Sequence, residues 1–295
     1  IYLSNNNLVG EIPSEIFTLG NLTNIHLSNN QLNGEMPLDF WSSSIINSAN
    51  LSYNELSGQI PLDLCTTFSN PENIFLKGNQ FCSEYPSCLN ENNMFPQNCE
   101  TTICNDGYVG LWGGCFEIET TTEIQIYDNG LNAPIPSEIG SLVNLNSLSL
   151  YTETTGFIPT EIGYLINLNS LILNCNLSGV IPTQIGSLVN LNRLDLYENQ
   201  LSGNIPNVIG ELVGLDYLAL NDNQLNGELP SEFDNLLNLE YLDLSNNFLT
   251  GSIPPEFGGI DSLKTLFLQQ NELTGEIPNE LSSIESLFSL NLSNN

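Results

Sequence analysis

The stretch LDLYENQLSGNIPNVIG, residues 194–210, decides the fold of this 295-residue chain. Its first half alternates leucine with polar residues and ends on Asn199, and its second half follows the pattern GxIPxxI. Alternating apolar residues favour a short strand. Glycine permits the backbone turn, and proline fixes φ at the start of a short helical segment. One copy of the pattern therefore predicts a strand, a turn and a short helix.

The same pattern recurs with a period of about 24 residues. Its second apolar strand position is occupied by Leu3, Leu27, Leu51, Leu76, Ile126, Leu150, Leu173, Leu196, Leu220, Leu244, Leu268 and Leu292. One coil cannot bury its own leucines, but stacked coils share a continuous core. We therefore predict an α/β solenoid, a right-handed superhelix of leucine-rich repeats with a parallel β-sheet on its concave face.

An asparagine stands three residues after most of these positions. A buried amide both donates and accepts hydrogen bonds, so a ladder of asparagines can satisfy the backbone at the turn of every coil. Glu153 is the exception, and the coils at Leu150 and Leu173 are each one residue short, with Cys175 in the second. The predicted ladder is Asn6, Asn30, Asn54, Asn79, Asn129, Asn176, Asn199, Asn223, Asn247 and Asn271.

The cysteines other than Cys175 form one cluster: Cys65, Cys82, Cys88, Cys99, Cys104 and Cys115. An even number in a short loop-rich stretch predicts disulfides and an oxidising compartment. The tight CxxC pairs typical of zinc sites are absent from the sequence. The sequence does not choose among the possible disulfide pairings. The sequence has neither an apolar run long enough to span a membrane nor a visible signal peptide.

The repeat resembles the plant-type leucine-rich repeats of receptor-kinase ectodomains and polygalacturonase inhibitors. The resemblance covers nearly the whole chain outside the cysteine-rich stretch, and it implies an extracellular setting. FCSEYPSCLNENNMFPQNC (81–99) resembles the cap that closes such arrays, and ICNDGYVGLWGGC (103–115) resembles the cap that opens them. The resemblance implies a Cys104–Cys115 bridge, with Cys65, Cys82, Cys88 and Cys99 paired among themselves.

These caps predict three regions. Residues 1–80 end a first array, residues 81–116 form a cysteine-rich junction of two caps, and residues 117–295 form a second array. The alternative is a ligand-binding island inside one solenoid. Both ends of the sequence stop within a repeat and lack caps, so we expect a segment that continues beyond them.

The charge is strongly negative, with 3 Lys+Arg against 34 Asp+Glu and a net charge of −31. Such a surface disfavours nucleic acid and anionic membranes. Acids also recur two residues after the repeat proline, where they favour the positive end of a short helix. Because few basic residues are present to neutralise these acids, the alternative interpretation is that the acids bind Ca²⁺ or a basic partner. We expect no other cofactor. The acids are Glu15, Asp39, Asp63, Glu138, Glu161, Glu232, Glu256 and Glu280.

Nothing in the sequence predicts an enzyme. His26 is the single histidine, it has no nucleophile elbow nearby, and the sequence lacks HExxH and P-loop motifs. The outward positions of the concave strands instead suggest a ligand face for peptide or polysaccharide, although aromatic residues also simply favour strands. Its candidate residues are Tyr127, Tyr151, Tyr197, Asp195, Tyr217, Tyr241, Asp243 and Phe267.

Four NxS/T sequons predict glycosylation, at Asn21, Asn50, Asn291 and Asn176. Asn176 is expected to stay bare because the ladder should bury it. Sugar on Asn50 or Asn291 would crowd the concave face.

Two principal functions follow. The first is an extracellular, self-associating structural or adhesive scaffold: a fibre, matrix or surface stalk. The alternative is a recognition ectodomain or secreted inhibitor that binds a peptide or polysaccharide. Ice binding ranks third, because the repeated threonine face that it needs is missing.

Overall fold

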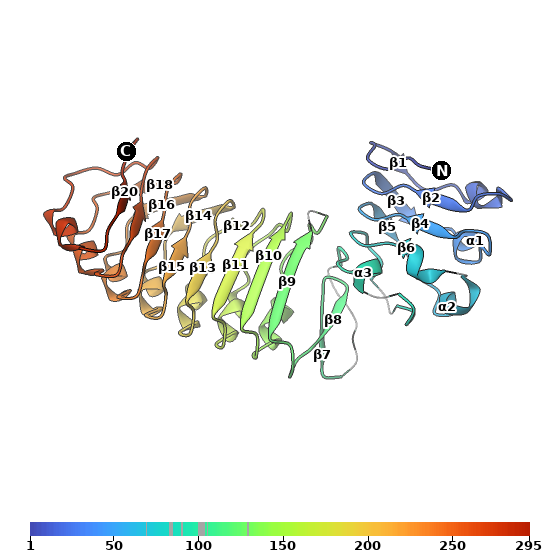
Figure 1. Ribbon diagram of the computed structural model, residues 1–295, viewed down its shortest axis with the longest axis horizontal. Helices are drawn as coiled ribbons and strands as arrows, with labels where there is room; N and C mark the ends of the chain where they lie inside the picture. The colour runs from blue at the N-terminus through green and yellow to red at the C-terminus, as the bar shows by residue number, and fades with distance from the viewer. Residues whose placement is uncertain (69, 83–84, 90, 100–103, 105, 129) are drawn as a thin grey trace. The chain divides into compact units, whose positions relative to one another are not determined.

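The computed structural model describes residues 1–295 except 69, 83–84, 90, 100–103, 105 and 129. The chain folds into two compact units. Unit 1 comprises Ile1–Phe116 with Gly130–Ala133, and unit 2 comprises Glu117–Asn129 with Pro134–Asn295. Both are α/β solenoids in which each repeat adds one coil (Figure 1). Among the described residues, no helix is long and apolar enough to cross a membrane.

Unit 1 carries two small parallel sheets. The first contains β2 (Asn24–His26), β4 (Ser48–Asn50) and β6 (Ile74–Phe75); the second contains β1 (Val9–Gly10), β3 (Gln31–Glu35) and β5 (Glu55–Ser57). Its short helices are η1 (Ser14–Thr18), α1 (Leu38–Trp41), α2 (Leu64–Thr67), η2 (Pro71–Asn73) and α3 (Glu91–Met94), and a hairpin of β7 (Tyr108–Leu111) and β8 (Gly114–Glu117) follows.

Unit 2 is built around an eight-stranded parallel sheet in which each strand pairs with the corresponding strand of the next coil. Its strands are β9 (Glu123–Asp128), β10 (Ser147–Thr152), β11 (Ser170–Asn174), β13 (Arg193–Asp195), β15 (Tyr217–Ala219), β17 (Tyr241–Asp243), β19 (Thr265–Phe267) and β20 (Ser289–Asn291). A four-stranded sheet follows the turn: β12 (Ser178–Gly179), β14 (Gln200–Asn204), β16 (Gln224–Glu228) and β18 (Phe248–Thr250).

Short 3₁₀ helices close the coils of unit 2, and the regular spacing of the repeat places each of them directly after its proline. They are η3 (Ser137–Ser141), η4 (Thr160–Tyr164), η5 (Thr183–Ser187), η6 (Asn207–Glu211), η7 (Ser231–Asn235), η8 (Pro255–Gly259) and η9 (Asn279–Ser283). The strand leucines Leu194 and Leu218 and the helix residues Ile209 and Phe233 are fully buried between the sheet and these helices. Each coil therefore contributes one layer to a continuous apolar core.

The asparagine ladder satisfies the backbone on the inner side of the turns. Asn223 shows the pattern: its Nδ2 donates to the carbonyls of Leu220 (3.1 Å) and Leu196 (2.9 Å), and its Oδ1 accepts from the N–H of Leu201 (2.9 Å). The residue before it, Asp222, has a left-handed φ of 55° that turns the chain inward. The same amide pattern is made by Asn30, Asn54, Asn79, Asn199, Asn247 and Asn271. Asn6 donates to the Leu3 carbonyl from an exposed position, and Asn129 lies outside the described residues.

The prediction that Asn176 is a buried ladder residue is wrong. Asn176 is half-buried, and its Nδ2 donates to the exposed carboxylate of Glu153 (2.9 Å). The cause is the missing residue in these coils: Thr152 and Cys175, at the place of the left-handed residue, do not have positive φ, so the strands β10 and β11 run on. The buried interior is filled by other groups.

Cys175 and two threonines take over the role of the amide in the short coils. The Cys175 thiol lies 3.6 Å from the Leu150 carbonyl and 3.4 Å from Thr152 Oγ1. Thr152 Oγ1 also donates to Oγ1 of the buried Thr154 at 2.7 Å. Burial raises the pKa of the Cys175 thiol, so it stays protonated and able to donate at neutral pH. The irregularity that the sequence left unexplained is thus a local replacement of the ladder.

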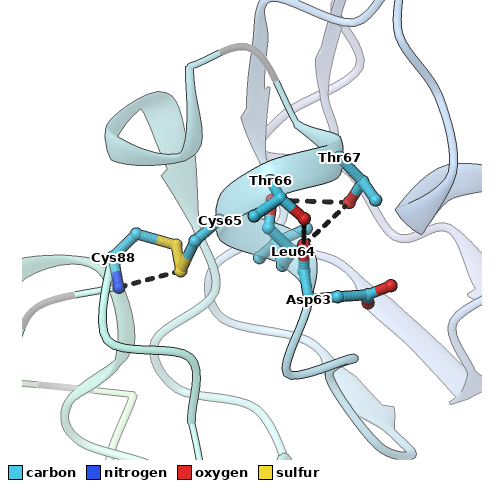
Figure 2. Close-up of a disulfide and its surroundings, with 6 residues drawn as sticks. All are labelled: Asp63, Leu64, Cys65, Thr66, Thr67 and Cys88. Carbon is cyan, nitrogen blue, oxygen red and sulfur yellow. Dashed lines mark hydrogen bonds between the residues drawn. A yellow bond between two sulfur atoms is a disulfide. The ribbon is translucent and has the colours of Figure 1, made fainter.

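Three disulfides hold the cysteine-rich region. Cys65 pairs with Cys88, Cys82 with Cys99, and Cys104 with Cys115. Cys65 lies in α2, and Figure 2 shows the backbone N–H of Cys88 reaching its sulfur at 3.2 Å. The bridge ties α2 to a segment 23 residues further along the chain.

Gln97, which the repeat pattern does not identify, extends the ladder of unit 1 by one coil. It is fully buried; its Nε2 donates to the Leu76 carbonyl at 3.0 Å, and its Oε1 accepts from the Phe81 N–H at 3.2 Å. These are the contacts that a ladder asparagine would make. The last regular strand of unit 1 therefore has its turn satisfied in the same way.

We predict that Asn223→Ala lowers the free energy of unfolding by about 2–4 kcal/mol, because it leaves buried carbonyl and N–H groups without partners. Asn176→Ala is the matched control, and its cost should stay below about 0.5 kcal/mol because its amide contacts an exposed carboxylate. Urea unfolding followed by circular dichroism measures both. Equal costs for the two variants would show that the ladder does not stabilise the coils.

Candidate ligand-binding surface

The outward residues of the eight-stranded sheet form columns, because the strands pair in parallel and in register. Arg193 lies opposite Tyr217, which lies opposite Tyr241. In the neighbouring column, Asp195, Ala219, Asp243 and Phe267 are successive partners. Tyr127, Tyr151 and Asn174 make a third column. We call the surface formed by Tyr127, Tyr151, Arg193, Asp195, Tyr197, Tyr217, Tyr241, Asp243 and Phe267 the sheet face.

Tyr217 is the centre of an aromatic stack on the sheet face. The Arg193 guanidinium carbon lies 3.7 Å from the centroid of its ring on one side. On the other side the Tyr241 ring is stacked at 4.5 Å with an interplanar angle of 4°. Phe267 then meets Tyr241 edge-on, at 6.1 Å and 81°. Both faces of the Tyr217 ring are therefore covered, and the ring presents its edge and hydroxyl.

The two carboxylates of the sheet face hold this stack in place. Asp195 is only 1% exposed and forms an ion pair with Arg193 at 2.5 Å. Asp243 accepts from the Tyr241 hydroxyl at 3.1 Å and from the backbone N–H and hydroxyl of Ser245 at 3.0 and 2.6 Å. Because Asp195 neutralises the guanidinium that covers Tyr217, the stack carries no net positive charge.

A second aromatic pair extends the sheet face toward β9. The rings of Tyr127 and Tyr151 are stacked at 4.9 Å and 10°, and Tyr127 is 68% exposed. Burial raises the pKa of Tyr151, and the nearby charge of Asp195 raises it further. Burial likewise raises the pKa of Tyr197 and Tyr217. These hydroxyls are therefore protonated at neutral pH and can donate hydrogen bonds.

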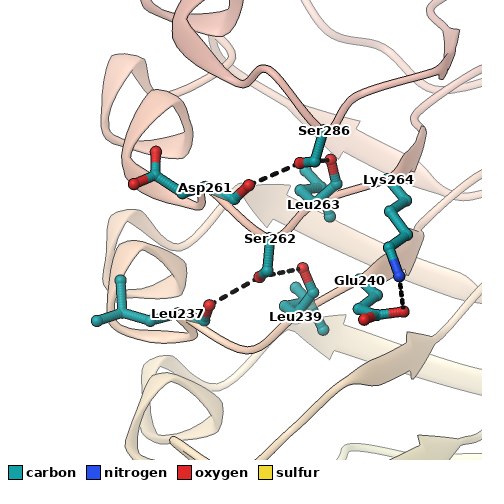
Figure 3. Close-up of polar contacts among 8 residues, drawn as sticks. All are labelled: Leu237, Leu239, Glu240, Asp261, Ser262, Leu263, Lys264 and Ser286. Atoms are coloured by element: carbon teal, nitrogen blue, oxygen red, sulfur yellow. Dashed lines mark hydrogen bonds and ion pairs between the residues drawn. The ribbon is translucent and has the colours of Figure 1, made fainter.

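The borders of the sheet face are acidic. Glu198 accepts from Asn174 at 3.2 Å, and Asp222 accepts from Asn221 at 2.7 Å. Burial and the neighbouring Glu240 raise the pKa of Asp216. Lys264, the second basic residue of unit 2, is paired with Glu240 at 2.6 Å, as Figure 3 shows. A ligand on the sheet face therefore meets carboxylates along both borders.

The other predicted sites lie in unit 1 or at the end of the eight-stranded sheet of unit 2. Asn21 is exposed; Asn50 in β4 and Asn291 in β20 each accept a backbone N–H through Oδ1, from Ser52 and Ser293. Their glycosylation stays a prediction. His26, in β2, is half-buried, with its ring centroid 4.8 Å from that of Tyr2.

The acids that stand two residues after the repeat prolines lie at or near the starts of the short helices, where a negative charge interacts favourably with the positive helix end. In the part of the chain that the structure describes, no three or more His, Cys, Asp or Glu side chains are grouped so that they could hold a metal ion. Binding of Ca²⁺ by these acids stays a prediction.

A second hydrogen-bond ladder was missed by the sequence analysis. Asn144, Asn167, Asn190 and Asn238 each donate through Nδ2 to a carbonyl of the preceding coil, at 2.8–3.0 Å. Ser262 and Ser286 continue it and reach two carbonyls each (Figure 3). The signal was visible in the sequence, because asparagine or serine recurs just before the buried leucine at this position.

Comparisons with known proteins agree with this architecture. Leucine-rich-repeat family models match residues 1–19, 21–43, 190–212 and 214–236, and also residues 230–273 and 239–295. The chain belongs to the leucine-rich-repeat family, of the plant type. The comparison with curated proteins found no match.

Similar solved structures are plant receptor-kinase ectodomains. One is the Arabidopsis receptor kinase HAESA in complex with the peptide hormone IDA and the co-receptor SERK1, with 28% identity and a TM-score of 0.58; the match covers 99% of this chain and 48% of that chain. Another is the ectodomain of GASSHO1/SCHENGEN3 from Arabidopsis thaliana in complex with CASPARIAN STRIP INTEGRITY FACTOR 2, with 30% identity, a TM-score of 0.56, and coverage of 100% and 35%. The PEPR1–AtPEP1 complex matches with 28% identity, a TM-score of 0.52, and coverage of 99% and 41%. The leucine-rich-repeat chain thus spans less than half the length of these ectodomains.

The Asp195 carboxyl makes a testable contribution to pH-dependent stability. Burial raises its pKa more than the Arg193 guanidinium lowers it, so the folded protein binds this proton more tightly than the unfolded chain does. Stability from this group is therefore present below the unfolded pKa of about 4 and is lost as the pH rises through the raised folded pKa.

We expect the melting temperature of wild type to fall relative to that of Asp195→Asn as the pH rises above about 4. Thermal melts of both proteins at matched ionic strength measure the difference, which isolates Asp195 from the other carboxyls. Asp222→Asn, at an exposed position, is the control and should follow wild type. A difference that grows in the opposite direction would mean that the ion pair with Arg193 dominates.

Proposed function

We propose that this chain is a non-enzymatic recognition segment of an extracellular, receptor-like ectodomain, and that it binds a peptide on the sheet face of unit 2. The observation that carries the proposal is the stack of Arg193, Tyr217 and Tyr241, held by Asp195 and Asp243 in a rigid, preorganised arrangement. Preorganised tyrosines bind with little loss of conformational entropy.

The ring geometry favours a peptide over a polysaccharide. Sugars stack on open aromatic faces, whereas the faces of Tyr217 are covered by Arg193 and Tyr241. Tyr127 and Tyr151 likewise stack on each other. The groups turned outward are ring edges and protonated hydroxyls, which suit the carbonyls and apolar side chains of a peptide.

The charge distribution favours a basic peptide. Arg193 and Lys264 are both paired with acids, and Asp216, Glu198 and Asp222 border the sheet face. The chain as a whole carries a net charge of −31, which speeds the approach of a cationic ligand. We therefore expect the ligand to carry lysine or arginine near its ends and an aromatic or aliphatic residue between them.

Recognition has better support than the structural scaffold that the sequence analysis favoured. Two of the similar solved structures hold a bound partner: the receptor kinase HAESA is in complex with the peptide hormone IDA, and the GASSHO1/SCHENGEN3 ectodomain is in complex with CASPARIAN STRIP INTEGRITY FACTOR 2. The three disulfides support an oxidising, extracellular setting. Self-association and polysaccharide binding gain no such support.

The test is to pan a displayed library of random peptides against the purified chain and to measure the affinity of the enriched peptides. We expect enrichment of basic peptides whose affinity falls at least roughly tenfold in Tyr217→Ala and in Tyr241→Ala. Glu256→Ala, on a 3₁₀ helix of the same unit, is the matched control and should keep full affinity. Enriched peptides that bind all three variants equally would place recognition outside the sheet face and overturn the proposal.

A further inference from the structure

A row of exposed apolar side chains crosses successive coils of unit 2. It consists of Val143, Ile166, Val189, Val213 and Leu237, which are 44%, 52%, 57%, 56% and 63% exposed. Each follows the buried leucine that comes directly after a 3₁₀ helix, so the row lies at the helix-to-strand loops rather than on the sheet face. We call these five residues the apolar row. Contiguous exposed apolar surface on a soluble protein commonly marks an interaction site.

The second hydrogen-bond ladder aligns this row. The carbonyls of Val143 and Ile166 accept from the side chains of Asn167 (2.9 Å) and Asn190 (2.8 Å) in the next coil. The Val213 carbonyl accepts from Asn238 (2.9 Å) and the Leu237 carbonyl from Ser262 (2.7 Å). The side chains therefore repeat at the spacing of the coils, and the row is roughly 20 Å long.

The same ladder shows what bounds the row. The Glu119 carbonyl accepts from Asn144 at 3.0 Å, which places Glu119 one coil before Val143. The Asp261 carbonyl accepts from Ser286 at 2.6 Å, which places Asp261 one coil after Leu237. Figure 3 shows the Leu237 and Asp261 side chains projecting on the same side of adjacent coils. Both acids are exposed, so the apolar row has a carboxylate at each end.

We propose that the apolar row docks an amphipathic helix of a partner protein, with an apolar stripe in its middle and lysine or arginine at both ends. The carbonyls of Val143, Ile166, Val213 and Leu237 already accept side-chain hydrogen bonds, so the row does not offer the continuous free edge that a β-strand would need. A partner must therefore contact the apolar row through its side chains, as a docked helix does. The two terminal carboxylates stand roughly 30 Å apart, which matches a helix of about 20 residues.

Charge also decides against a second copy of this chain as the occupant. Two molecules that each carry a net charge of −31 repel one another, and the acids at the ends of the row would face like charges. A helix with basic ends instead gains an attraction at both ends. The docking surface is separate from the sheet face and does not depend on the proposed peptide binding.

The test uses the whole chain and a fluorescently labelled synthetic helix of about 20 residues, with a leucine stripe and two lysines at each end. Fluorescence anisotropy at several salt concentrations measures binding. We expect Val189→Ser combined with Val213→Ser to weaken binding roughly tenfold. Glu119→Gln combined with Asp261→Asn should weaken it several-fold and reduce its salt dependence.

Two controls make the outcome decisive. A peptide of the same charge with serine in place of leucine should bind at least roughly tenfold more weakly than the leucine peptide. Tyr217→Ala, on the sheet face, shows whether the basic probe binds there instead: weaker binding by this variant together with unchanged binding by the valine variants would overturn the proposal. Urea midpoints establish that every variant is folded. Equal binding of the serine peptide, or unchanged binding by the valine variants, would overturn the proposal. So would sedimentation velocity showing a wild-type dimer that the valine variants dissociate, because the occupant would then be a second copy.

Discussion

The hydrogen bonds of the ladder asparagines are the interaction on which the rest of this molecule depends. Each coil turns inward after three or so strand residues, and the turn leaves carbonyls and an N–H that no strand partner reaches. Asn223 satisfies two carbonyls and one N–H across two coils with a single side chain. Without such a group, every turn would bury unpaired backbone, at a cost of about 1–3 kcal/mol for each orphaned group.

The ladder also sets the register that builds the surfaces. Because the regular coils are tied to one another at the same position, outward residues fall into straight columns on the sheet. That register brings Arg193, Tyr217 and Tyr241 together although each is 24 residues from the next. The second ladder does the same on the loops that follow the 3₁₀ helices, where it aligns the apolar row. One repeat thus generates two distinct surfaces from the same spacing.

Much of the fold and of the sheet face was predictable from the period of the sequence repeat alone. The period identified the solenoid, the ladder and the columns of the sheet face, because it places residues by position rather than by contact. It could not show that Tyr217 has both ring faces covered, since that depends on the rotamers of Arg193 and Tyr241. Nor could it foresee that Cys175 and Thr154 replace the amide in the short coils, or that Gln97 does so 18 residues after Asn79, outside the period. In these places local geometry decides which side chain reaches the backbone.

The sheet face of unit 2 is proposed to recognise a peptide. A crystal structure of the chain with the tightest-binding selected peptide tests it most directly. We predict a peptide that crosses β13, β15 and β17, with hydrogen bonds to the hydroxyls of Tyr217 and Tyr241 and basic side chains toward the acidic borders. A peptide seated against the 3₁₀ helices, or on unit 1, would contradict it.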